Sequence, residues 1–267
     1  MMRLLSPLSL ALLLAGAAQA LVAQTADQAR LMFTIGFGVT ANTANLWRVG
    51  NQPFQVDPGT IDTLSVARDF RRSLNVILSG TYFPGDHLGF NVEAQLIGLA
   101  SKDKCDIEAT TGSIITYDLC STINREERSA TSAAISGGLI YRIGSRQVIH
   151  PYVRTNLGIL ITQQSFIKMR GFVTGDEFED AELTLFDDRD PARIQPYVSF
   201  GGGLVAVIGR GYQFRAEVRD NYVRVPSITG PTSRQGIVPP TELRGKHVLS
   251  MTIGFDVVLE RKRGRRY

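Results

Sequence analysis

Short segments in which apolar and polar residues alternate run through most of the chain. In residues 194–220 two such segments flank a short turn, and the apolar face of the second consists of Tyr212, Phe214, Ala216 and Val218. A period of two puts successive side chains on opposite faces of a β-strand. The face that meets water decides whether such strands form a soluble β-protein or a barrel in a membrane.

The same alternation predicts eight strands separated by connections of two kinds. The strands are predicted at residues 30–41, 70–83, 88–101, 129–143, 151–164, the two halves of 194–220, and 246–259. Long connections (42–67, 102–128, 165–192 and 226–245) alternate with short ones at 84–87, 144–150 and 209–211. An antiparallel meander with this order has every long connection at one end, and every short turn and both termini at the other. Closing the meander removes its exposed edges, so the predicted fold is all-β, an eight-stranded antiparallel up-and-down transmembrane barrel.

Residue types on the polar face favour placing that face inside the barrel. Gly, Ser, Thr and Asn suit a narrow interior, whereas the opposite face is almost entirely aliphatic or aromatic. Charges of both signs accompany the small residues: Glu93, Arg154, Arg215, Glu217, Arg219 and Asp256. Opposite charges in a low-dielectric interior should pair, and we expect a polar network that plugs the lumen. A gated ion path lined by these charges is the alternative.

Aromatic residues on the apolar face gather near the short turns. Tyr82, Phe90, Tyr141 and Tyr212 are predicted to form a girdle at one membrane boundary. The ordinary preference of aromatic residues for strands is the alternative explanation. A soluble, lipocalin-like binding barrel would instead turn the apolar face inward.

The first twenty residues have the features of an export signal. A basic start is followed by an apolar run and by the small-x-small sequence Ala18-Gln19-Ala20, which is a cleavage pattern. No later stretch has the ~18 consecutive apolar residues that a spanning helix needs. We predict a signal peptide (1–20), a barrel (21–259) and a basic tail (260–267), with a retained N-terminal anchor as the alternative to cleavage.

Both cysteines, Cys105 and Cys120, lie in the second long connection. Export places them in an oxidising compartment, which favours a local disulfide over two free thiols. No histidine lies close by in sequence to complete a metal site.

The chemistry of the remaining polar residues does not indicate an enzyme. His87, His150 and His247 are predicted at separate turns or ends, away from a serine partner. The connection at 165–192 is strongly acidic, which fits a solvated surface better than a Ca²⁺ loop. The net charge of +4 comes largely from the tail, so the folded body shows no basic stripe for nucleic acid. No cofactor or metal is predicted.

Four segments carry a resemblance to a known family: HPYVRTNLGIL at 150–160, QPYVSFGGGLVAVIG at 195–209, RAEVRDNYVRV at 215–225 and MTIGFDVVL at 251–259. With them the chain resembles the small eight-stranded outer membrane β-barrels of diderm bacteria, the OmpA-like, OmpX-like and OmpW-like group. It departs from that pattern at its end, because Leu259 is followed by a basic tail and not by a strand-terminal aromatic residue.

The resemblance implies an integral outer membrane protein with both termini in the periplasm, in contact with outer membrane lipids and with the assembly machinery. It implies a non-enzymatic role, structural or in surface interactions through four exposed loops, and the surface ligand stays open. A narrow OmpW-like channel for small or apolar solutes is the alternative.

Overall fold

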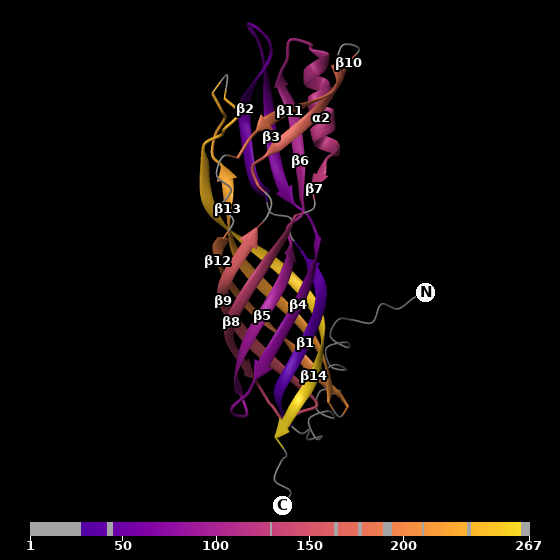
Figure 1. Ribbon diagram of the computed structural model, residues 1–267, viewed down its shortest axis with the longest axis vertical. Coiled ribbons are helices and arrows are strands. Elements are labelled where there is room, and N and C mark those ends of the chain that lie inside the picture. The colour runs from indigo at the N-terminus through magenta and orange to yellow at the C-terminus, as the bar shows by residue number, and fades with distance from the viewer. Residues whose placement is uncertain are drawn as a thin grey trace, which may run out of the picture.

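A computed structural model shows an elongated molecule in which a barrel carries a second folded layer on one end (Figure 1). The structure describes residues 28–41, 45–128, 130–162, 165–175, 178–188, 194–209, 211–233 and 236–262. The predicted signal peptide and the last five residues of the predicted tail lie outside these ranges.

The barrel is closed by eight antiparallel strands in the order β1-β14-β13-β12-β9-β8-β5-β4. They are β1 (Gln28–Thr40), β4 (Ser73–Tyr82), β5 (Leu88–Gly98), β8 (Thr131–Arg142), β9 (Ile149–Thr162), β12 (Ile194–Gly209), β13 (Tyr212–Ile228) and β14 (Thr241–Lys262). The predicted fold is confirmed, and the bounds of most strands differ from the predicted ones by a few residues. β14 runs to Lys262, so the first residues assigned to the tail continue the last strand.

The apolar face of each barrel strand points outward. Phe37, Phe200 and Leu204 leave 60%, 63% and 53% of their surface exposed, whereas Asn75 and Ser79, from the polar face, are buried in the lumen. On β14 the outward apolar positions run from Leu249 to Leu259, ten steps of about 3.4 Å along a tilted strand, or roughly 25 Å of height. That height matches the apolar band of an outer membrane barrel. The outward direction of the apolar face contradicts the soluble alternative, which would turn that face inward.

The long connections are not open loops, which corrects the prediction of four polar connections. Three of them contain regular structure: β2 (Asn45–Asp57) and β3 (Thr60–Phe70) in the first, and β10 (Met169–Gly175) and β11 (Phe178–Phe186) in the third. The second contains β6 (Ser101–Ala109), α2 (Ile114–Arg125) and β7 (Glu127–Arg128). We call the described residues within 41–72, 99–130, 165–188 and 229–240, with the ends of β13 and β14 that adjoin them, the cap.

Inside the cap, a four-stranded sheet of order β2-β3-β6-β7 packs with α2 and with the β10–β11 hairpin (Figure 1). The sequence pattern did not predict the helix, because α2 is short and only one of its faces is apolar. Its buried residues Thr116, Leu119, Cys120 and Ile123 follow the i, i+3, i+4, i+7 spacing of an amphipathic helix. No helix among the described residues is both long and apolar enough to cross a membrane.

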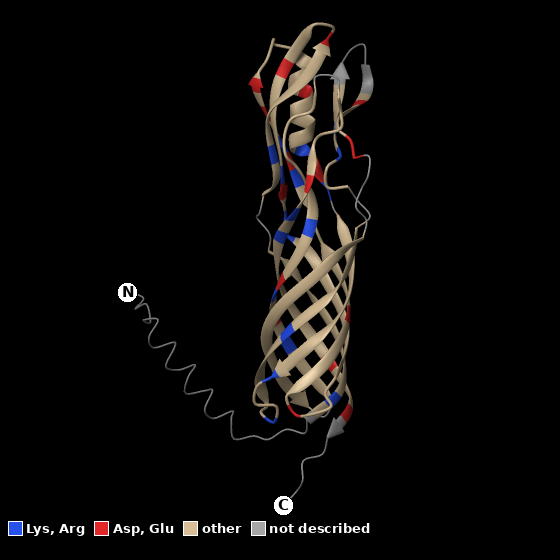
Figure 2. Cartoon of the chain, turned by 90° about the vertical axis from the view of Figure 1, so that its left-hand side faces the viewer, with Lys and Arg blue, Asp and Glu red and all other residues tan. Residues whose placement is uncertain are grey.

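Figure 2 shows that charge follows the two layers of the molecule. Lys, Arg, Asp and Glu gather in the cap and around the two rims, and few lie along the barrel strands between them, where the exposed side chains are mainly apolar. The barrel is therefore built to meet lipid and the cap to meet water.

Candidate functional site: a filled lumen beneath a folded cap

The six charged residues predicted for the lumen are all buried there, and they pair with one another. Glu93 on β5 and Glu217 on β13 lie between two arginines. Arg154 Nη2 is 2.6 Å from Glu93 Oε2, and Arg154 Nε is 2.8 Å from Glu217 Oε1. Arg219 bonds both carboxylates, with 2.8 Å from its Nε to Glu217 Oε1. Charge therefore balances within this four-residue cluster.

A second pair extends the network toward the short-turn end. Arg215 Nη2 lies 2.9 Å from Asp256 Oδ2, and its guanidinium covers the ring of Tyr152 at 4.8 Å from the centroid. Tyr152 donates a 2.5 Å hydrogen bond to Glu217 Oε2. Tyr152 was not among the predicted lumen residues, although it lies two residues before Arg154 on the same buried face of β9.

Apolar side chains close the lumen at both ends. At the short-turn end lie Ala29, Met32, Phe83, Ile140, Tyr152 and Val205. Arg142 completes this end by covering the Phe83 ring at 3.7 Å and donating to the carbonyl oxygens of Ala29 and Asp86. At the cap end, Ile97, Leu160, Tyr197, Val223 and Val248 belong to the same apolar core as Trp47 and Phe186 of the cap. The core is therefore continuous from the lumen into the cap.

Arg68 of β3 joins three of the connections inside the cap. It is 1% exposed and forms two hydrogen bonds with Asp103 of β6. It also donates at 2.8 Å to the carbonyl oxygens of Phe166 and Lys168 in the third connection. Trp47 reaches the same Phe166 oxygen with its indole N–H at 2.9 Å. The fourth connection is tied in through Gln52 and Thr232, which exchange two hydrogen bonds.

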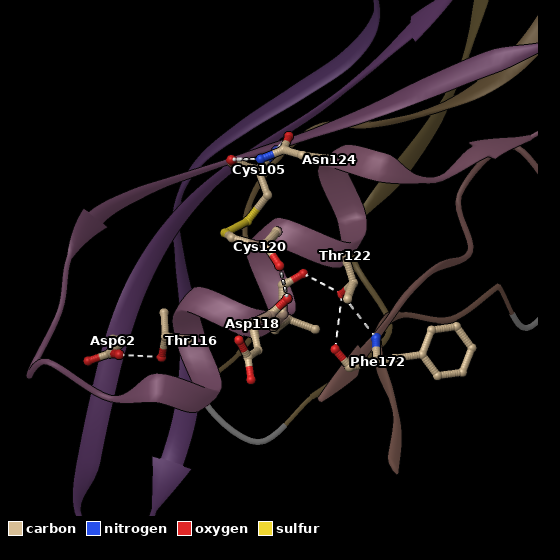
Figure 3. The surroundings of a disulfide bond; sticks show 10 residues. Asp62, Cys105, Thr116, Asp118, Cys120, Thr122, Asn124 and Phe172 are labelled. Atoms are coloured by element: carbon tan, nitrogen blue, oxygen red, sulfur yellow. Dashed lines mark hydrogen bonds between the residues drawn. A yellow bond between two sulfur atoms is a disulfide. The ribbon is translucent and has the colours of Figure 1, made fainter. Parts of the chain in front are cut away.

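The predicted disulfide between Cys105 and Cys120 is present and ties α2 to β6 (Figure 3). Asn124, one turn farther along the helix, supports the same attachment. Its side-chain amide exchanges hydrogen bonds of 2.9 and 2.8 Å with the backbone N–H and C=O of Cys105. The side chain thus occupies the open edge of β6 as a neighbouring strand would.

Asp62 on β3 holds the start of α2 through four hydrogen bonds. It accepts from the hydroxyls of Thr110, Thr111 and Thr116, and from the Thr111 backbone N–H at 2.8 Å. Burial disfavours its charge, but the hydrogen bonds from Thr116 and Thr111 outweigh that cost and keep the pKa of Asp62 below its usual value. No group of three or more potential metal ligands occurs among the described residues.

Outside the barrel, the four predicted girdle residues lie near the short turns. Tyr82, Phe90, Tyr141 and Tyr212 are 39–53% exposed. Tyr82 faces Phe90 across the β4–β5 ladder, and Tyr212 stacks on Phe255 with ring centroids 5.4 Å apart. His247 pairs with Asp220 Oδ2 at 2.7 Å, whereas a ring nitrogen of His87 and one of His150 lie 2.9 and 3.2 Å from the backbone carbonyl oxygens of Arg142 and Gln147.

A closed barrel with an apolar outside and a filled polar lumen is the architecture of the small outer membrane β-barrels. A scan against protein-family models gives no match for this sequence, and no curated protein matches it. Among solved structures, the outer membrane protein OprG from Pseudomonas aeruginosa shares 12% identity and a TM-score of 0.51, over 88% of this chain and 97% of that one.

Two other solved structures are similar at lower scores. They are the outer membrane protein AlkL (14% identity, TM-score 0.42, 91% of this chain and 97% of that one) and Neisserial surface protein A (11%, 0.41, 86% and 96%). The closed barrel and its similarity to OprG show that the chain has the fold of the small eight-stranded outer membrane barrels, as its sequence predicts. At these identities the likeness concerns the fold alone.

Proposed function

We propose that this protein is a non-enzymatic outer membrane anchor that holds a folded interaction module, the cap, at the cell surface. The observation that carries the proposal is the apolar core that runs without interruption from the lumen into the cap. In a channel, the connections would have to leave the mouth of the barrel open. Here they bury Trp47, Leu64, Val66 and Phe70 on top of it.

The filled lumen supports an anchoring role. Ion pairs between Glu93, Glu217 and their arginine partners occupy its middle, and apolar clusters lie at either end. Breaking a buried pair leaves an uncompensated charge, at a cost of about 3–5 kcal/mol. Such a network favours a rigid wall over one that rearranges to admit solutes.

The proposed orientation places the cap outside the cell and both termini in the periplasm, after removal of residues 1–20 as a signal peptide. The assembly machinery would insert the barrel, and outer membrane lipids would surround its apolar belt. The aromatic girdle would then mark the inner boundary of the membrane, and the basic tail would meet the periplasm.

Single cysteines introduced at opposite ends of the barrel test the orientation in intact cells. Tyr117→Cys, on the exposed face of α2, should react with a membrane-impermeant maleimide. Arg146→Cys, at the short β8–β9 turn with 65% of its side chain exposed, is the matched control and should react only after permeabilisation. The reverse pattern would contradict the proposal.

Conductance in planar bilayers tests the channel alternative. We expect no single-channel steps from the purified full chain at any holding voltage. Stable openings whose conductance changes on charge reversal at Glu93 or Arg215 would show that the protein is a narrow channel and not an anchor, since charged lumen residues set selectivity.

A further inference from the structure

A pocket of about 510 Å³ lies in the cap between the second and third connections. Its walls come from the segment that follows α2 and from the β10–β11 hairpin. This volume is within the range of ~300–1,000 Å³ of small-molecule sites. The pocket lies apart from the lumen network.

Charged residues of both signs line the pocket in equal number. They are Glu126, Glu127, Glu182, Arg128, Lys168 and Arg170. Two pairs form, each within one wall: Arg128 Nη2 is 2.8 Å from Glu126 Oε2 in the segment after α2, and Arg170 bonds Glu182 within the β10–β11 hairpin. The formal charge of the lining therefore sums to zero, which gives no preference for an anionic or a cationic ligand.

One aromatic ring interrupts this polar lining. Phe172 is 41% exposed, and its ring projects away from α2 (Figure 3). Its backbone is fixed by Thr122, whose hydroxyl lies 3.1 Å from the Phe172 nitrogen and 3.0 Å from its carbonyl oxygen. Phe172 faces Glu182 across the β10–β11 ladder, so the two side chains are neighbours on the same face of the hairpin.

We propose that this pocket binds a neutral sugar ring. The inference rests on the surface module proposed above and specifies the class of ligand that the module would bind. Each sugar hydroxyl is both a donor and an acceptor, and the pocket offers donors from Arg128, Lys168 and Arg170 next to carboxylate acceptors. The C–H face of the ring would stack on Phe172, because an aromatic face supplies apolar contact area at little conformational cost. The described residues hold no cluster for a metal ion.

Saturation-transfer NMR on the full chain in lipid nanodiscs tests the site. The probes are glucose, galactose, mannose and N-acetylglucosamine and their disaccharides, each at about 10 mM, which detects weak binding. We expect transfer to the ring protons of at least one sugar. Phe172→Ala should weaken that binding about tenfold, and Glu182→Gln should weaken it as well.

Tyr117→Ala removes another exposed aromatic ring of the cap, away from the pocket, and should leave sugar binding unchanged. The proposal is overturned if no probe binds, or if Phe172→Ala and Tyr117→Ala have equal effects.

Nanodiscs with and without lipopolysaccharide distinguish the source of the sugar. Displacement of the probe by lipopolysaccharide identifies a glycolipid of the same membrane, and unchanged binding identifies a soluble glycan. The maleimide labelling of introduced cysteines tests separately whether the cap lies outside the cell. A cap that is labelled in intact cells but binds no sugar would contradict the sugar site alone, and a cap that is not labelled would contradict the surface module.

Discussion

Arg68 and Asp103 form a doubly hydrogen-bonded ion pair in the interior of the cap, with 2.5 Å between Nε and Oδ1 and 2.7 Å between Nη2 and Oδ2. Both side chains are 1% exposed. The pair joins β3 to β6, and the remaining donors of Arg68 hold the third connection. Removal of either partner would leave the other charged and buried, so the cap depends on both.

Replacing Arg68 should loosen the cap without opening the barrel. We expect Arg68→Ala to destabilise the cap by at most about 3–5 kcal/mol, because buried Asp103 would keep its charge with only Arg128 Nε, 3.7 Å away, to balance it. Limited proteolysis of the purified protein would show faster cleavage within residues 99–130. The heat-modified band on a gel would persist, because the eight barrel strands keep their hydrogen bonds.

Lys104→Ala is the control for Arg68→Ala. Lys104 follows Asp103 in sequence and pairs with Asp69, but half of its side chain is exposed. An exposed pair is worth about 0–1 kcal/mol. Equal cleavage rates in the two variants would contradict the role assigned to Arg68.

The lumen should respond to the loss of Glu217. This carboxylate accepts hydrogen bonds from Tyr152, Arg154 and Arg219, so Glu217→Gln leaves two guanidiniums with one carboxylate fewer. The expected loss is about 3–5 kcal/mol, measured as a lower temperature of conversion between the folded and unfolded gel bands. Glu260→Gln, in the exposed pair with Arg30, should convert at the wild-type temperature. An equal shift in both variants would mean that the lumen pairs do not stabilise the barrel.

Gly171 permits close packing between β10 and α2. A Cβ atom at this position would lie 2.5 Å from Leu119 Cδ1 and 3.0 Å from Thr122 Oγ1. We expect Gly171→Ala to push the helix outward and cost about 1–3 kcal/mol, seen as faster hydrogen exchange in α2. Gly80→Ala, where a Cβ would meet nothing within 4 Å, should leave that exchange unchanged. Slow exchange in both variants would refute the close contact.

The barrel could be predicted from sequence because each of its strands alternates over a long run, and because its charged residues fall on the polar face. The cap could not, for reasons visible in β3. Asp62 and Arg68 are buried on the same face as Leu64 and Val66, so charged residues interrupt the apolar pattern that would mark a strand. Both charges are satisfied by partners from other connections, Thr116 and Asp103, and a single sequence does not reveal such partners.

The charged lumen residues could be chosen from alternation alone, but their pairing could not. Arg154 and Arg219 lie on strands that are not neighbours, and they meet across the lumen through Glu93 and Glu217. Barrel closure decides which side chains meet, and it depends on the stagger of the strands. Phe172 and its pocket were beyond prediction for a similar reason, because the segment after α2 reaches the β10–β11 hairpin only in the folded cap.

Acid should release the start of α2 before it affects the barrel. The pKa of Asp62 is lowered in the folded protein, so its ionised form contributes stability above the unfolded value of 3.8. That contribution is lost as the pH falls below this value through the folded pKa. Hydrogen exchange at low pH should therefore rise first in the amides of Thr111 and the first turn of α2.

Thr116→Val tests whether the hydrogen bonds to Asp62 cause this behaviour. It removes one donor at nearly constant volume, so the pKa of Asp62 should rise and α2 should open at a higher pH than in the wild type. Thr122→Val, on the same helix but bonded to Phe172 and not to Asp62, is the matched control and should keep the wild-type pH of opening. An unchanged opening pH in Thr116→Val would assign the acid response to another group.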